Sequence, residues 1–141
     1  MRLLLLLCAS SVMVLSGPVY IDELEDLLPR GADKRELEML DDDKYMIRSE
    51  KQRRLDAILQ RQPDYIQQTY KAKVAQKQAQ RASKQQYKQI RADQQGRGSF
   101  VAEEIAIDND MGISSAEADR REYKLKRRYY AANPSLMFDD D

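Results

Sequence analysis

Apolar residues recur at helical spacing in the first part of the chain and predict two short helices there. The first helix ends at Pro29 and Gly31, and its apolar positions at i, i+3, i+6 and i+7 are Ile21, Leu24, Leu27 and Leu28. A second helix is expected after Asp33, which would act as the N-cap, with Glu36 completing a capping box. The apolar face of this second helix is formed by Leu37 and Leu40.

The middle of the chain has the longest helical pattern. A helix is predicted over 43–62, before Pro63 breaks it, and its apolar positions are Ile47, Leu55, Ile58 and Leu59. The next segment, 64–95, carries Ile66, Tyr70 and Val74 at intervals of four residues. Twelve Gln, eight Lys or Arg and no Glu in 60–95 favour a helix by propensity. Because its apolar face fades after Val74, we expect this helix to be marginal in water without a partner.

A flexible break at 96–99 separates this helix from the last part of the chain. A short apolar patch follows, made of Phe100, Val101, Ile105 and Ile107. Residues 109–115 predict a turn, and 116–132 predict a helix with Ser114 or Ser115 as its N-cap. The acidic end, 133–141, is expected to be unstructured, and we find no internal repeat. The predicted fold class is mostly α, with long amphipathic or basic helices, disordered linkers and tail, and no compact disulfide core.

The N-terminus has the order of a secretory signal peptide. Arg2 precedes an apolar run from Leu3 to Leu15, and small residues follow, so we predict a signal peptide over 1–16 with cleavage after Ser16. The alternative is an uncleaved anchor, although a bilayer span needs about 20 apolar residues. Cleavage removes Cys8, the single cysteine, and leaves a secreted mature chain without a disulfide.

The net charge of zero conceals three segments of opposite sign. The acidic segment 17–43 has a net charge of −7, the basic Gln-rich segment 44–97 has +10, and the acidic segment 98–141 has −4. Nucleic acid is not expected as a partner of the basic segment, because the chain is predicted to be secreted and the segment has too few tyrosines to stack on bases. Binding of this segment to a membrane surface would need a stronger apolar face. The N-terminal apolar run is too short for a stable membrane span.

Composition excludes several kinds of catalytic and metal site. With no His and one Cys, the chain has no Ser-His-Asp or Cys-His system and no thiolate or imidazole zinc site. The sequence also lacks a Gly-rich phosphate loop and a convergent carboxylate pair. We therefore expect no enzymatic activity and no cofactor.

Paired basic residues suggest a function. Prohormone convertases cut after two adjacent basic residues, because their subsites hold two cationic side chains of an extended peptide. Such pairs occur at Lys34-Arg35, Arg53-Arg54, Arg120-Arg121 and Arg127-Arg128. With the secretory signal, this pattern resembles secreted neuropeptide and peptide-hormone precursors. The resemblance implies processing proteases and a cell-surface receptor as partners, products such as 36–52 and 129–141, and Gly96 as an amide donor.

A second hypothesis is an uncleaved extracellular structural or matrix protein that binds calcium weakly through its acidic segments. Residues 108–117 resemble an EF-hand loop, with Asp108, Asp110 and Glu117 as the carboxylate ligands. The EF-hand loop has twelve positions, but here Gly112 is fifth and Glu117 is tenth, so two residues are missing. A turn followed by a Ser-capped helix is the competing interpretation of this segment.

Overall fold

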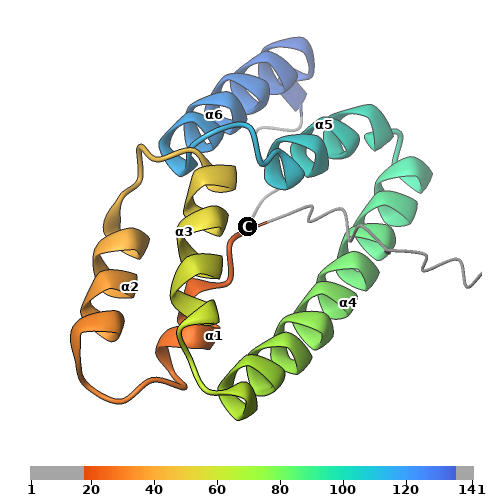
Figure 1. Ribbon diagram of the computed structural model, residues 1–141. Coiled ribbons are helices and arrows are strands. Elements are labelled where there is room, and N and C mark those ends of the chain that lie inside the picture. Colours follow the sequence, from red (N-terminus) through yellow and green to blue (C-terminus); the bar gives the residue numbers. More distant parts are fainter. Residues whose placement is uncertain (1–17, 136–141) are drawn as a thin grey trace, which may run out of the picture.

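The computed structural model describes residues 18–135, so Cys8 and the predicted cleavage site at Ser16 lie outside the described residues. Within this part of the chain the helices follow one another without an intervening sheet, which confirms the mostly α fold class (Figure 1). The six described helices are α1 (Ile21–Glu25), α2 (Ala32–Asp42), α3 (Arg48–Gln60), α4 (Asp64–Gln94), α5 (Gly98–Asn109) and α6 (Ser115–Ala132). None of these helices is long and apolar enough to cross a membrane.

The larger hydrophobic cluster joins α1, α2, α3 and the first turns of α4. Leu24 of α1, Leu37 of α2 and Leu55 of α3 have no exposed side-chain surface, and Tyr70 of α4 is 5% exposed. The helical spacing seen in the sequence produces this cluster, because each helix directs one apolar face inward. The short first helix is thus held by packing rather than by its own length.

The smaller hydrophobic cluster lies at the other end of α4. Ala92 of α4, Phe100 and Val101 of α5, and Leu125 of α6 are buried together. The ring of Tyr129 stacks on Phe100 with 4.3 Å between the ring centroids. The apolar patch for which the sequence pattern predicted no secondary structure is therefore part of the helix α5, and it packs in this cluster.

The long helix α4 connects the two clusters. Its Ile66 and Tyr70 belong to the larger cluster and its Ala92 to the smaller one. In Figure 1, α4 runs obliquely from the end of α3 to the start of α5. The neighbouring elements therefore supply the packing partners that this weakly amphipathic helix lacks by itself.

The segment between α4 and α5 is an ordered turn instead of the flexible break expected at 96–99. Gly96 has a φ of 74°, a left-handed conformation that costs glycine little, and the Arg97 amide donates to the carbonyl of Ala92. A Cβ on Gly98 would lie 1.9 Å from a carboxylate oxygen of Asp93. The turn thus depends on a positive φ at one glycine and on close approach at the other.

Two helix N-termini differ in how well the sequence predicts them. Of the two serines expected as possible caps, Ser114 caps α6, since its Oγ accepts a hydrogen bond from the amide of Glu117 at 3.1 Å. The prediction that Asp33 is an N-cap is wrong, because α2 begins at Ala32 and Gly31 occupies the N-cap position. The carboxylate of Asp33 instead accepts hydrogen bonds from Arg61 and Gln62 after the end of α3. A tertiary interaction here replaces the local cap.

The structure contains a repeat that sequence inspection alone did not reveal. The unit α2–α3 has its turn at 43–47, and the unit α5–α6 has its turn at 110–114. When the sequences of the two units are aligned, identical residues coincide: Glu36 with Glu103, Asp41 with Asp108, Asp43 with Asp110, Glu50 with Glu117, Arg53 with Arg120 and Arg54 with Arg121. Each turn begins with an Asp whose side chain accepts backbone N–H bonds inside the turn.

The two turns pair with each other through their backbones. Ile47 and Ser114, which occupy the same position in the two units, form an antiparallel bridge. The amide of Arg48 donates to the carbonyl of Ile113 at 3.0 Å, and that of Ala116 donates to Lys44 at 3.0 Å. The repeated units are therefore related by an approximate two-fold arrangement centred on this bridge.

Replacing Leu55 by Ala tests the contribution of the larger cluster. Because Leu55 is fully buried, Leu55→Ala should lower the free energy of unfolding by about 2–5 kcal/mol, measured by urea denaturation. Ile90→Ala serves as the control, since Ile90 is 51% exposed and its truncation should cost far less. Equal losses for the two variants would contradict the proposed core.

Candidate functional site

Every paired basic residue named as a processing site lies within a helix. Lys34 and Arg35 are in the first turns of α2, and Arg53 and Arg54 are inside α3. The pairs of α6 are Arg120 with Arg121 and Arg127 with Arg128. A protease that binds an extended peptide would have to unwind these helices before cleavage.

Glutamates hold two of these arginine pairs in the same way in the two units. Glu50 accepts hydrogen bonds from Arg53, three residues later, and from Arg54, four residues later, at 2.7–3.0 Å. In α6, Glu117 is bonded likewise by Arg120 and Arg121 at 2.7 and 2.8 Å. Such i,i+3 and i,i+4 pairs stabilise a helix modestly.

These hydrogen bonds change the acidity of the two glutamates. Bonds from Arg53 and Arg54 lower the pKa of Glu50 to about 2. Bonds from Arg121 and Arg120 lower the pKa of Glu117 below its usual value. Both carboxylates therefore stay ionised well below neutral pH, and the four arginines keep their partners there.

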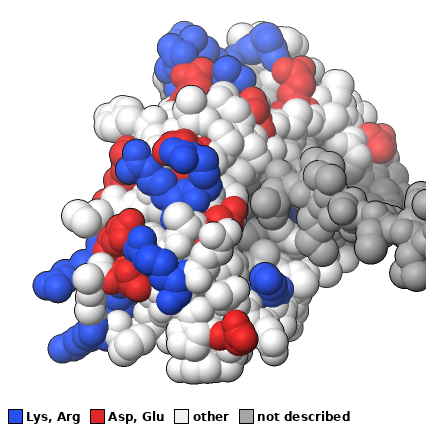
Figure 2. Space-filling view, viewed as in Figure 1, with Lys and Arg blue, Asp and Glu red and all other residues white. Residues whose placement is uncertain are grey.

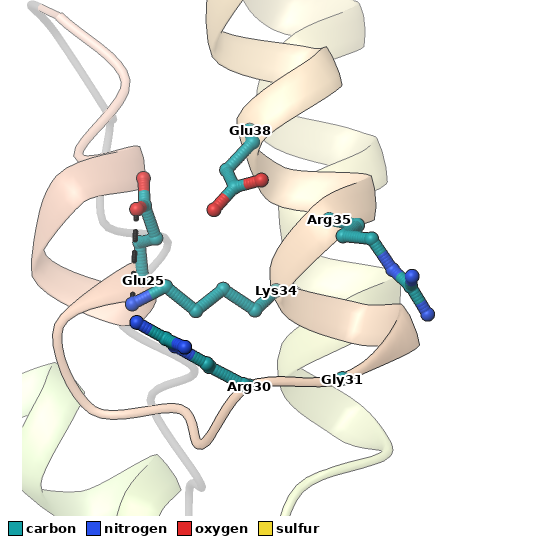
Figure 3. Close-up of a pocket in the computed structure, with 6 residues that line it drawn as sticks. All are labelled: Glu25, Arg30, Gly31, Lys34, Arg35 and Glu38. Atoms are coloured by element: carbon teal, nitrogen blue, oxygen red, sulfur yellow. Dashed lines mark ion pairs between the residues drawn. The ribbon is translucent and has the colours of Figure 1, made fainter.

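The pair Lys34-Arg35 differs from the others because it borders an open polar groove of about 640 Å³ between α1 and α2. Figure 3 shows Lys34 and Arg30 reaching toward Glu25, while the side chain of Arg35 points away from Glu25. The Lys34 ammonium lies 3.8 Å from a Glu25 carboxylate oxygen. Lys34-Arg35 is thus the pair nearest to the irregular segment 26–31.

The three carboxylates proposed as calcium ligands are paired with arginines. Asp108 lies 2.6 Å from Arg81 of α4, and Asp110 lies 3.5 Å from Arg121. Glu117 is bonded to Arg121 and Arg120, as described above. Over residues 18–135, no three acidic side chains gather in a way that could hold a metal ion.

Two protein cations bind carbonyl groups at the ends of α2 and α5. An Nη of Arg48 donates to the carbonyls of Ile107, Asp108 and Asp110, each at 3.1 Å. The ammonium of Lys51, a residue only 5% exposed, donates to the carbonyl of Asp41 at 2.9 Å. Favourable placement of a cation at a helix C-terminus explains both contacts. Sequence analysis missed both residues, because their partners lie in other helices.

Gly96, the residue predicted as an amide donor, lies in the turn after α4. The amide of Gly96 donates to the carbonyl of Asp93, and that of Gln95 donates to Arg91 and Ala92. The turn therefore uses Gly96 for its backbone conformation, whether or not any processing occurs there.

Ion pairs connect the basic helix α4 to the acidic segments on both sides of it. Lys77 lies 2.7 Å from Glu23 of α1, and Lys88 lies 2.9 Å from Glu104 of α5. On the face visible in Figure 2, positive and negative side chains lie next to one another. The charge segments that look separate along the chain are thus mixed in space.

Two cavities lie along α4, and Tyr20 lines both of them. The apolar cavity, of about 320 Å³, is lined by Tyr20, Leu59, Tyr70, Val74 and Ala75, with polar residues around them. The basic cavity, of about 420 Å³, is lined by Tyr20, Lys77, Arg81, Lys84 and Asp108 among others. Burial, followed by the charges of Asp56 and Glu23, raises the pKa of Tyr70, whose hydroxyl donates to the carbonyl of Tyr20.

The chain was compared with known proteins, and it matches no protein-family model, no curated protein and no solved structure. The geometry described above is therefore the basis for the functional proposal.

Acid titration tests the glutamate–arginine clusters. Because the folded-state pKa of Glu50 lies near 2 rather than at its ordinary 4.5, its stabilising contribution is complete above pH 4.5 and is lost as the pH falls toward 2. Glu50→Gln should therefore reduce the fall in Tm over this pH range, measured by thermal unfolding at low salt. Glu122→Gln is the matched control, and an identical pH profile for both variants would contradict the assignment.

Proposed function

We propose that the mature chain acts outside the cell as an intact helical binding protein, and that it is not a source of short peptides. The signal-peptide pattern of residues 1–16 supports secretion. The observation that carries the proposal is the helical placement of every paired basic residue within one packed fold. This favours the second of the two functions considered from sequence, the uncleaved extracellular protein.

Cleavage would also damage the core. A cut after Arg35 would separate α1 from the remaining chain. Ile21 and Leu24 of α1 are only 2% and 0% exposed, so this cut would detach a part of the larger cluster. A cut after Arg54 would fall directly before the buried Leu55. Since buried apolar surface is the main source of stability, processing at these pairs would work against the fold.

The proposed function does not include calcium binding. The Asp108, Asp110 and Glu117 carboxylates already have arginine partners, and Arg48 binds the carbonyls at the end of α5. These internal cations balance charge where the matrix-protein hypothesis would place calcium.

The peptide precursor remains a second candidate for one specific reason. Lys34-Arg35 lies in the first turns of α2, beside the irregular segment 26–31, and the side chain of Arg35 points away from Glu25 in Figure 3. Helix termini open more easily than helix interiors, so this pair would be cut first.

Intact-mass measurement tests the choice between these functions. The full chain, expressed in a secreting eukaryotic cell, should appear in the medium as a single species that has lost only residues 1–16. The purified protein should resist a prohormone convertase in native buffer, because its paired basic residues are helical. As the control, a peptide spanning 30–40 should be cut after Arg35 under the same conditions. Discrete fragments 36–52 or 129–141 from the native protein would overturn the proposal and support the precursor.

A further inference from the structure

The face of α4 that turns toward Tyr20 changes character along its length. Tyr70 and Val74, one turn apart, line the apolar cavity, and Lys77 and Arg81 on the following turns line the basic cavity. Tyr20 is common to both cavities. Along α4, an apolar cavity is therefore followed by a positively charged one, and the two share Tyr20.

Two residues that line these cavities each have a buried polar atom without a hydrogen-bond partner among the described residues. These atoms are the hydroxyl of Tyr20 and the Nε of Arg81. Buried polar atoms are nearly always paired, so an unpaired atom needs a partner such as water or a ligand. An anionic oxygen would satisfy either donor, since both donate.

Charge at the basic cavity favours an anion. Lys77, Arg81 and Lys84 contribute three positive charges, and Asp108 is the one carboxylate that lines the cavity. Arg81 is paired with Asp108 and Lys77 with Glu23, whereas Lys84 has no ion pair among the described residues. The sizes of the cavities, about 320 and 420 Å³, lie in the range of small-molecule sites.

We propose that the two cavities form one binding site for a single-chain lipid anion. The acyl chain lies against Tyr70, Val74 and Ala75, and the carboxylate or phosphate head lies near Arg81 and Lys84. This inference rests on the proposed function, because only an intact chain brings Tyr20 and α4 together. It identifies the ligand of the proposed binding protein as an amphipathic anion.

Calorimetric titration of the delipidated full-length secreted protein tests the site. Oleate and oleoyl lysophosphatidate serve as the carboxylate and phosphate probes, both below their micelle concentrations, and oleyl alcohol serves as the neutral probe. Saturable binding with one site per chain is expected for at least one anion, and the tighter of the two identifies the head group. The alcohol should bind at least about tenfold more weakly. Absence of saturable binding by both anions, or equal binding of the alcohol, would overturn the proposal.

Matched variants locate the ligand. Ala75→Trp fills the apolar cavity and should raise the Kd about tenfold or more, whereas Ala79→Trp, on the same helix but outside both cavities, should leave it unchanged. Lys84→Glu should weaken anion binding, and Lys124→Glu on α6 makes the same charge change away from the site. If the two variants of either pair change the Kd equally, the ligand binds elsewhere. Circular dichroism confirms that each variant is folded.

The two proposals fail in different ways. If the secreted chain is intact but binds neither anion, the lipid site is wrong and the intact-protein function stands. If the chain is cut in the secreting cell while uncut protein binds lipid, the site stands and the proposed function is wrong.

Discussion

The backbone pairing of the turn 43–47 with the turn 110–114 is the constraint on which the arrangement of the helices depends. It joins two helix–turn–helix units that are far apart in sequence, at the bridge between Ile47 and Ser114. Arg48 strengthens the same junction, because its guanidinium binds three carbonyl groups at the end of α5. Once the two turns are joined, α4 must reach from the end of α3 to the start of α5. Its two ends then pack into different hydrophobic clusters.

This role of α4 accounts for its unusual composition. The helix needs apolar side chains only at its ends, where Tyr70 and Ala92 are buried. Between these ends its inner face carries Lys77 and Arg81, whose partners are Glu23 of α1 and Asp108 at the end of α5. The two cavities lie along this part of the helix. The fold thus places a polar, cavity-forming segment between two well-packed ends.

The role of the arginine pairs depends on the conformation of the chain. In an extended chain, Arg53-Arg54 and Arg120-Arg121 would match the paired basic residues after which a convertase cuts. In the helices, the same spacing brings each pair within reach of one glutamate, Glu50 or Glu117. The conformation therefore determines whether a pair is open to a protease or bonded to a glutamate. The helical conformation is maintained by the burial of neighbouring residues such as Leu55 and Leu125.

The sequence by itself determined the features that depend on neighbouring residues: the mostly α class, the break at Pro63 and a serine cap at 114 or 115. Each of these follows from contacts within one or two helical turns, which the order of residues specifies directly. Only the tertiary structure decided that 98–109 is helical, that Asp33 binds Arg61 and that two units repeat around a bridge. The reason is physical, because these features depend on groups that are distant along the chain and meet only when the helices pack. The cavities beside Tyr20 belong to the same category, since no single segment contains their walls.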